Sequence, residues 1–348
     1  VAGNDVTRLL NYCKIYDTAV ISKFRFSLRE PPVDDLASYC FFMFRDLELD
    51  KHFNIKSETL ARFILLVRKG YRDVAYHNFM HAACTLHFAY LLLKNLKLVE
   101  SKYITQLEAL ALMISCICHD LDHRGTTNSF QMKSHTVLAN LYSSEGSVME
   151  RHHFAQAVCI LNTEDCNILN GVPEEDYTQC LNLVQRTDLA VHIKEFDEQQ
   201  KVLSEFDRNN EQHRHHLLCL FMTAADLSDQ TKTWTVSRKT AELVYREFFS
   251  QGDMEKEMGT SPIEAMDREK AHIPSLQIQF LETVVIPCYR FLTKLFPETE
   301  YCIKAATFNR ECWIAANDIF STQWMKGGFE LLSNPDLEEK IDTTMRMK

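Results

Sequence analysis

Long apolar runs with a spacing of three and four residues are the feature that most limits what this chain can fold into. The spacing recurs at 58–71, 81–96, 107–118, 213–227, 237–251 and 276–296. Because an α-helix turns every 3.6 residues, this spacing places the apolar side chains on one helical face, whereas a strand would alternate. Only 9 glycines and 8 prolines interrupt 348 residues. The sequence therefore predicts an all-α protein of many helices.

The bulk composition excludes several classes of function. A chain of this length forms one large or two smaller domains with a substantial core. The net charge of -10 argues against general binding to nucleic acid or to an anionic membrane. Twelve scattered cysteines without CxxC pairs indicate reduced, buried thiols in a cytoplasmic protein. The apolar runs are too short to span a bilayer, so we expect no membrane insertion.

Two segments depart from the helical pattern. Residues 250–275 are charged and contain two glycines and two prolines, which predicts a long mobile loop between helices, of the kind that often borders an active site. The periodicity decays after about residue 320. The sequence thus predicts one catalytic domain over 1–320 and a loosely ordered C-terminal tail over 321–348.

Four ionisable residues follow the apolar run at 107–118 directly: His119, Asp120, Asp122 and His123. On a continuing helix, His119 and His123 would share a face and Asp120 would lie close to His123. Buried charges need a charged partner or a metal ion. Taken alone, the cluster is equally well explained as the polar end of a helix.

A second histidine pair, His77 and His81, has the same four-residue spacing, and Asp226 ends another apolar run. Two histidines and two carboxylates suit a zinc ion, and a carboxylate such as Asp120 can bridge to a second, more hydrated ion, typically magnesium. Two such ions would hold a bridging hydroxide and clamp a phosphate in line with it. His77, one turn from a ligand, would then act as general acid.

Six motifs occur in a fixed order along the chain: YHNFMHA, HDLDHRG, MERHHF, TDLA, TAADLSDQTK and LQIQF. Together they resemble the motif set of the class I cyclic nucleotide phosphodiesterase catalytic domain, over roughly residues 30–315. Segments such as YSSEGSVMERHHFAQA and FDRNNEQH look most like phosphodiesterase type 2. The resemblance implies a compact multi-helix domain of the HD type with a deep, metal-floored pocket. It also implies hydrolysis of both cAMP and cGMP to 5′-monophosphates, under the control of upstream GAF domains.

The resemblance implies a role for each matching residue. The zinc ligands would be His81, His119, Asp120 and Asp226. The water shell of magnesium, or of manganese in its place, would be held by His123, Glu150 and Thr187. His77 would protonate the leaving O3′. The purine would be held by Gln277 and Phe280, and the rest of the substrate pocket would be formed by Tyr76, Leu189, Leu227, Asp229, Gln230, Val244 and Phe248.

Base preference would depend on the freedom of one amide. Gln277 and Phe280 are three residues apart on one helix, so an amide and a ring can meet the same base. A glutamine that rotates can present its donor or its acceptor first and can pair with adenine or guanine. A glutamine that is pinned favours one base.

Two positions depart from the family pattern. The stretch LNLVQRTDLA is about four residues short, which moves Thr187 and Leu189 by about 6 Å along a helix. Ala265 is smaller than the apolar residue that type 2 relatives carry there. The three histidines at 213–216 lie in a polar helix start, and we interpret them as solvated surface.

Two other functions compete with cyclic nucleotide hydrolysis. A broader metal-dependent phosphohydrolase could act on nucleoside mono- or triphosphates, although the pair Gln277 and Phe280 argues against it. A catalytically silent module could bind cyclic nucleotides without turnover, if the short stretch before Thr187 has damaged the site. Type 2 relatives dimerise mainly through parts outside this match, so a homodimer of a full-length protein stays open, as does membrane attachment through such parts.

Overall fold

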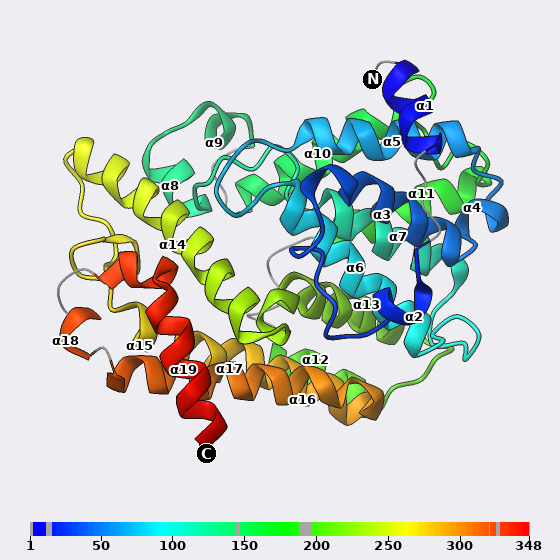
Figure 1. Ribbon diagram of the computed structural model, residues 1–348. Helices are drawn as coiled ribbons and strands as arrows, with labels where there is room; N and C mark the ends of the chain where they lie inside the picture. Colours follow the sequence, from blue (N-terminus) through cyan, green and yellow to red (C-terminus); the bar gives the residue numbers. More distant parts are fainter. Residues whose placement is uncertain are drawn as a thin grey trace. The chain divides into compact units, whose positions relative to one another are not determined.

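The computed structural model describes residues 3–11, 16–142, 147–187, 196–319, 321–324 and 328–347. Every regular element in these ranges is a helix or a helical turn, and none is a strand (Figure 1). The predicted all-α class is therefore confirmed. The chain divides into two compact units, Val1–Asp73 with His77–Asp226, and Val74–Tyr76 with Leu227–Lys348.

The first unit is built around the buried helices α6 and α7. Its elements are α1 (Gly3–Asn11), α2 (Thr18–Ile21), η1 (Val33–Asp35), α3 (Leu36–Asp46), α4 (Leu49–His52), α5 (Ser57–Gly70), α6 (Phe79–Asn95), α7 (Gln106–Cys118), α8 (Asn128–Lys133), α9 (Val137–Leu141), α10 (Val148–Leu161), α11 (Glu174–Thr187), α12 (Phe196–Ser204) and α13 (Glu211–Asp226). α6 and α7 pack side by side (Figure 1), and α13 contacts both. Nearly all side chains of α6 and α7 are buried, as expected for helices apolar on every side.

Local capping fixes where these two helices begin. The side chain of Asn78 accepts hydrogen bonds from the backbone N–H groups of Met80 and His81, at 3.0 and 3.4 Å. Thr105 and Glu108 form a capping box at the start of α7. Both caps satisfy N–H groups that a helix start leaves unpaired.

The prediction that each histidine pair shares a helical face is wrong. α6 begins at Phe79, so His77 precedes the helix cap. α7 ends at Cys118, so His123 lies in the turn beyond it, after Asp122 with a φ of 59°. The polar residues lie at and beyond the helix ends instead of extending the helices. The four-residue spacing alone does not reveal where a helix ends.

The second unit holds α14 (Trp234–Glu257), α15 (Ile273–Phe280), α16 (Ile286–Leu295), α17 (Glu300–Ile319), α18 (Ser321–Trp324) and α19 (Pro335–Met347). Its 3₁₀ turns are η2 (Ser228–Thr231), η3 (Glu264–Met266), η5 (Pro297–Thr299) and η6 (Gly328–Ser333). α17 contacts α14, α15, α16 and α19. Trp313 of α17 is fully buried and packs edge-on against Trp234, with 4.9 Å between the ring centroids. This helix is the core of the unit.

A π turn, η4 (Leu281–Val285), joins α15 to α16 without a break. Pro287 follows it. Proline has no N–H to donate, and its ring would clash with the carbonyl four residues back, so a regular α-helix cannot pass through it. The π turn takes one more residue around the axis and absorbs this defect. Phe280 is the last residue before it.

The loop expected over 250–275 is wrong in its first part, because α14 continues to Glu257. Gly252 lies inside the helix, where an added Cβ would stand 1.9 Å from the carbonyl oxygen of Met266. We call residues 258–272 the strap. Ion pairs of 2.7 Å from Lys256 to Asp267 and 2.5 Å from Arg268 to Asp253 bind it to α14. Glycine was a sign of close backbone approach here and not of a loop.

Residues 321–347, expected as a loosely ordered tail, form α18, η6 and α19 in the described ranges. Leu337 and Ile341 of α19 are buried. Arg238 of α14 donates a hydrogen bond to the Glu338 carboxylate at 2.5 Å and another to the carbonyl oxygen of Leu332. A division into a domain and a tail at residue 320 stays a prediction.

The thiols and the helix lengths bear on the remaining expectations. Among the described cysteines, all are free thiols and only Cys159 is exposed. Burial raises the pKa of Cys288 and of Cys302 to about 12, so these thiols stay protonated at neutral pH. None of the described helices is both long and apolar enough to cross a bilayer.

Candidate functional site

Four predicted ligands meet in the first unit. His81 comes from the first turn of α6, His119 and Asp120 follow the end of α7, and Asp226 ends α13. His81 Nε2 lies 3.1 Å from His119 Nε2, 2.9 Å from Asp226 Oδ1 and 3.4 Å from Asp120 Oδ2. His119 Nε2 lies 3.1 Å from Asp120 Oδ2 and 3.3 Å from Asp226 Oδ1. We call these four residues the His-Asp cluster.

The His-Asp cluster has the dimensions of a tetrahedral zinc site. Ligand bonds of about 2.0–2.1 Å place the corners of a tetrahedron about 3.3 Å apart. The measured separations of 2.9–3.4 Å lie close to that edge length. His81, His119 and Asp226 form one of the groups whose ligand atoms all lie close enough together to hold a metal ion. The residues present therefore fit a metal ion.

The electrostatics of the cluster also favour a cation. Burial opposes a charged His119, but Asp120 and Asp226 outweigh it and raise the pKa of the imidazole well above its usual value. Burial likewise opposes the Asp120 carboxylate, but His119, His77 and hydrogen bonds from the cluster histidines hold its pKa well below the usual value. The Asp226 side chain is 48% exposed, and its hydrogen bonds and charge interactions with His119 and His81 hold the pKa of its carboxyl below the usual value. Two ionised carboxylates at one point stabilise positive charge, which a metal ion would supply.

Neighbouring groups orient these ligands. His119 Nδ1 donates to the carbonyl oxygen of Cys116 at 2.9 Å, which orients the ring so that its other nitrogen, Nε2, faces the cluster. The hydroxyl of Tyr71 donates to the carbonyl oxygen of Ile117 at 2.9 Å and accepts from the backbone N–H of Asp120 at 3.3 Å. Tyr71 thus fixes the backbone that carries Asp120, and no motif in the sequence pointed to it.

Asp120 faces two groups at once. Its Oδ2 lies towards His81 and His119, and its Oδ1 lies 3.7 Å from His153 Nε2. Asp120, His123 and His153 form a second group close enough to hold a metal ion. Burial lowers the pKa of His153 to about 4, so its imidazole is neutral and can bind a metal or a metal-bound water. The geometry suits a carboxylate that bridges two ions.

The sequence could not choose between His152 and His153, and the structure separates them. Both belong to α10, at neighbouring positions that point in different directions. His153 reaches Asp120, whereas His152 Nε2 lies 2.7 Å from Asp122 Oδ2. Asp122 is the third ionisable residue of the HDLDH stretch, and its partners are described below.

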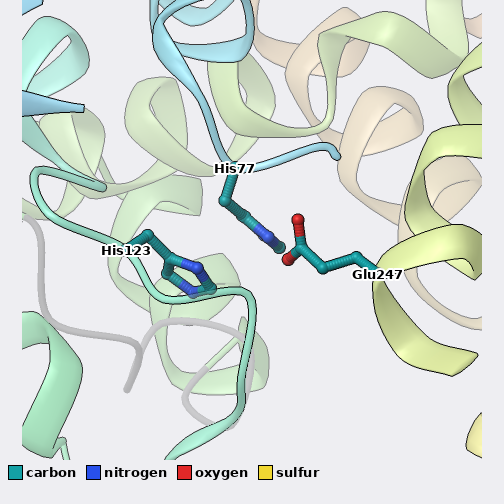
Figure 2. Close-up of side chains that lie close together, drawn as sticks. All are labelled: His77, His123 and Glu247. Carbon is teal, nitrogen blue, oxygen red and sulfur yellow. The ribbon is translucent and has the colours of Figure 1, made fainter. Parts of the chain in front are cut away.

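His77, the predicted acid, lies beside the second group. Figure 2 shows its ring next to that of His123, and the two stack at 4.1 Å with an angle of 27° between them. The His77 ring also lies edge-on to His81, at 5.7 Å. Figure 2 also draws Glu247 of the second unit, whose carboxylate accepts a hydrogen bond from the backbone N–H of Tyr76 at 2.9 Å.

The residues expected around the purine belong to the second unit. Gln277 is buried, and its Nε2 donates to the hydroxyl of Tyr245 at 3.3 Å. Its Oε1 is buried with no hydrogen-bond partner among the described residues. Phe280 lies one turn further along α15 and is half-buried. An orphaned buried acceptor beside an accessible ring is the arrangement that a base edge would complete.

The other predicted pocket residues have defined places. Val244 and Phe248 are half-buried, four residues apart on α14, and Phe248 packs edge-on against Tyr245 at 5.9 Å. Leu227 precedes η2, in which Asp229 and Gln230 are buried. Gln230 Oε1 accepts from Ser237 Oγ at 3.1 Å, and its backbone carbonyl accepts from Asn309 Nδ2 at 2.9 Å. Gln230 is therefore held by its own unit.

Three further residues were predicted around the second ion and the pocket, and the structure describes the side chain of one of them. Glu150 accepts hydrogen bonds from Asn128 Nδ2 at 3.0 and 2.8 Å, at the start of α8. Thr187 is the last residue of α11, and its side chain lies outside the described residues. Leu189 also lies outside the described residues.

Comparison with known proteins gives a consistent family. The family model of 3'5'-cyclic nucleotide phosphodiesterase matches residues 76–306. A probable 3',5'-cyclic phosphodiesterase of Caenorhabditis elegans, pde-5, is 38% identical over 282 residues, which is 79% of this chain and 38% of the relative. A cGMP-specific 3',5'-cyclic phosphodiesterase of Drosophila ananassae is 39% identical over 322 residues, 90% of this chain and 28% of the relative. The chain thus spans well under half the length of these relatives.

Solved structures agree with the fold. The structure of LmjPDEB1 in complex with IBMX has a TM-score of 0.83 and 29% identity, and covers 92% of this chain and 99% of that one. The phosphodiesterase domain of the RhoPDE fusion protein from the choanoflagellate Salpingoeca rosetta has a TM-score of 0.79 and 28% identity, with 87% and 97% covered. With the family model matching most of its length, the chain belongs to the 3'5'-cyclic nucleotide phosphodiesterase family.

Proposed function

We propose that this chain hydrolyses 3′,5′-cyclic nucleotides to 5′-nucleoside monophosphates with the help of two metal ions. The observation that carries the proposal is the His-Asp cluster, in a chain of the phosphodiesterase family. We assign zinc to His81, His119, Asp120 and Asp226, and magnesium or manganese to the group of Asp120, His123 and His153. When bound, these ions supply Lewis-acid stabilisation of the phosphate charge and activate the attacking water.

The protein itself supplies the proton. Cleavage of the P–O3′ bond leaves an alkoxide that needs protonation. We assign this step to His77, whose ring stacks on His123 beside the second group. A protonated His77 would donate to O3′ and then regain a proton from solvent. We assign to Thr187 and Glu150 only an indirect part in holding water near the second ion.

We propose that the base is recognised by Gln277 and Phe280, with Tyr76, Leu189, Leu227, Gln230, Val244 and Phe248 as further substrate contacts. The partner of Gln277 supports a broad substrate range, because a tyrosine hydroxyl both donates and accepts. Tyr245 can therefore satisfy either face of the amide by turning its own O–H. This argument favours turnover of both cAMP and cGMP, as in phosphodiesterase type 2.

A second candidate is a preference for cGMP. Several relatives, such as the Drosophila ananassae and Drosophila melanogaster proteins, are named cGMP-specific. Under this candidate the amide of Gln277 would be held in one orientation, with Nε2 on Tyr245 and Oε1 towards the guanine. The two candidates share the reaction and differ only in the base.

The test is product formation from cAMP and from cGMP, side by side, with Mg²⁺ and trace Zn²⁺ and with a chelator control. Chelator-sensitive turnover of both nucleotides is the expected result. Turnover of cGMP alone would keep the reaction and replace the broad range by the second candidate. Absence of turnover, with zinc bound and cyclic nucleotide still binding, would favour the silent module.

A substrate panel separates the proposal from a broader phosphohydrolase. It would contain 5′-nucleoside mono- and triphosphates beside the cyclic nucleotides. We expect the cyclic nucleotides alone to be hydrolysed, because the proposed roles are recognition of a purine by Gln277 and Phe280 and protonation of O3′ by His77. Faster hydrolysis of the linear nucleotides would contradict the proposal.

A further inference from the structure

We propose that Asp122 is a positioning residue that holds the metal loop, residues 119–125, in the shape required by the second metal ion. The inference rests on the proposed metal assignment, which gives His119, Asp120 and His123 roles but leaves Asp122 with none. This carboxylate nonetheless contacts three basic side chains, Arg72, Arg124 and His152. Its contacts connect the loop to neighbouring parts of the first unit.

The Asp122 carboxylate collects three charged or polar donors. Its Oδ1 accepts from Arg72 Nε at 2.5 Å. Its Oδ2 accepts from Arg124 Nη2 at 3.0 Å and from His152 Nε2 at 2.7 Å. An ionised carboxylate only accepts, so His152 carries its proton on Nε2, and its Nδ1 can accept from Tyr142, whose hydroxyl lies 3.1 Å away. Asp122 thereby ties together the chain before α6, the loop itself and α10.

The backbone at Asp122 is equally constrained. Its φ of 59° lies in the left-handed region, which aspartate adopts more readily than most residues. Its N–H donates to the carbonyl oxygen of Gly70 at 2.9 Å. The reversal lets the chain turn away from α7 after Leu121 and return His123 towards Asp120. A left-handed residue persists only where the surrounding contacts determine it.

Several contacts join the loop to α10, among them a hydrogen bond from His153 Nδ1 to the carbonyl oxygen of Leu121 at 2.5 Å and the stacking of the His123 and His153 rings at 5.6 Å. Two of the contacts involve the carboxylates of the loop. Asp122 meets His152, and Asp120 meets His153. The His-Asp cluster draws His81 from α6 and Asp226 from α13, and only His119 and Asp120 from the loop. The group of Asp120, His123 and His153 has donors only from the loop and α10. Loss of Asp122 should therefore disturb the second ion far more than the first.

The experiment compares metal binding in the wild-type chain and in the variant Asp122→Asn. Asparagine keeps the size of aspartate and tolerates a left-handed backbone, but its amide nitrogen cannot accept from the donors around it. The protein is stripped of metal, reloaded with one equivalent of Zn²⁺ and titrated with Mn²⁺ under electron paramagnetic resonance. We expect zinc to be retained and Mn²⁺ to bind at least about tenfold more weakly, as for other groups that orient metal ligands.

A matched control and a second variant make the result decisive. Asp165 also has a left-handed backbone, with a φ of 61°, and is exposed in the turn before Cys166, so Asp165→Asn should bind Mn²⁺ as the wild type does. Arg72→Met removes one donor at a half-exposed site and should weaken Mn²⁺ in the same direction even if Asp122→Asn does not fold. An unchanged Mn²⁺ affinity in both Asp122→Asn and Arg72→Met would overturn the role of Asp122 and leave the proposed second ion in place. A wild-type protein that binds no Mn²⁺ would overturn the proposed second ion, and this role with it.

Discussion

A carboxylate at the end of an apolar helix needs a partner of opposite charge. Asp226 Oδ1 lies within 3.3 Å of the imidazoles of His81 and His119. His81 and His119 could be chosen from the sequence for a similar reason, since each stands at the edge of an apolar run. His153 could not, because its use depends on which way α10 faces, and two neighbouring histidines share one motif. Tyr71 acts through a backbone N–H that no sequence pattern records. Sequence reasoning thus proposed candidate ligands that the structure brings together, and it missed the residues that orient them.

Replacing Asp226 by Asn should remove one charged ligand while the fold persists. We expect the affinity for zinc to fall by about 100-fold or more, so that less zinc stays bound. We also expect turnover of cyclic nucleotides to fall to background. Elemental analysis of the dialysed protein measures the first, and the nucleotide assay the second. Asp207→Asn, at an exposed carboxylate before α13, should leave both unchanged. Full zinc content and activity in Asp226→Asn would contradict the ligand assignment.

Tyr245→Phe removes a single hydroxyl beside Gln277. Burial raises the pKa of this tyrosine to about 12, so the group is a neutral hydroxyl at working pH. Without it, the buried amide loses its partner, which costs about 1–2 kcal/mol in the free energy of unfolding. We also expect the ratio of KM for cAMP to KM for cGMP to change, since the amide is no longer held. An unchanged ratio would show that Tyr245 has no part in base preference.

At the scale of elements, the helices themselves were predictable and their limits were not. Periodicity identified the segments that became α5, α6, α7, α13 and α14. The last turns of α14 and the C-terminal helix were not predicted, because tertiary contacts determine them. Gly252 permits the backbone of Met266 to approach α14, and Arg238 contacts Glu338 of α19, which lies 100 residues further along the sequence. Local composition cannot record contacts made by distant parts of the chain.

The close approach at Gly252 can be tested with one methyl group. Alanine normally stabilises a helix interior by about 1 kcal/mol relative to glycine. In Gly252→Ala the new Cβ would meet the Met266 carbonyl, so the strap must move, and overpacking of this kind costs about 1–3 kcal/mol. We expect a lower urea midpoint for Gly252→Ala and no decrease for Gly3→Ala, where the space is open. A stabilised Gly252→Ala variant would contradict the packing described here.

The contact between α14 and α19 should make stability depend on pH. Burial raises the pKa of Glu338, but the Thr235 hydroxyl and Arg238 outweigh it, so the pKa lies below its usual value. A lowered pKa in the folded chain means that the stabilisation is complete above the unfolded value of about 4.3 and is lost as the pH falls below it. The variant Glu338→Gln should be less stable than wild type at pH 7, by about 1–2 kcal/mol.

The two proteins should then converge in acid. Denaturant unfolding at pH 7, 5, 4 and 3 measures the difference between them. Glu330→Gln, in which the exposed carboxylate of η6 is replaced, provides the matched control and should show no such convergence. A constant difference between wild type and Glu338→Gln over the whole range would exclude an ionised contact.

At the scale of the whole molecule, the negative net charge is the main obstacle to binding an anionic substrate. The chain carries a net charge of -10 and is proposed to bind an anionic phosphodiester. Such a pair repels at long range unless cations reverse the sign locally. The His-Asp cluster concentrates ionised carboxylates where ions would be bound, so the same residues would serve stability and substrate binding. Composition alone predicts only the repulsion between the acidic chain and an anionic substrate.

Metal removal should therefore weaken the whole fold. A ligand that binds only the native state adds about 2.7 kcal/mol to the free energy of unfolding at 100 times its Kd. We expect the Tm to fall after chelation and to recover with Zn²⁺, measured by calorimetry. Asp226→Asn, with a ligand missing, should respond much less. If chelation left the Tm of the wild type unchanged, no metal would be bound in the native state.

The π turn between Phe280 and Pro287 also has a consequence for evolution. Each residue of a helix rotates the following ones by about 100°. The wider turn at Leu281–Val285 resembles a single-residue insertion that the proline keeps in place. Deleting one residue there would rotate α16 and everything after it while leaving Gln277 and Phe280 untouched. The packing of the second unit and its proposed base-contacting residues could thus change independently of each other during evolution.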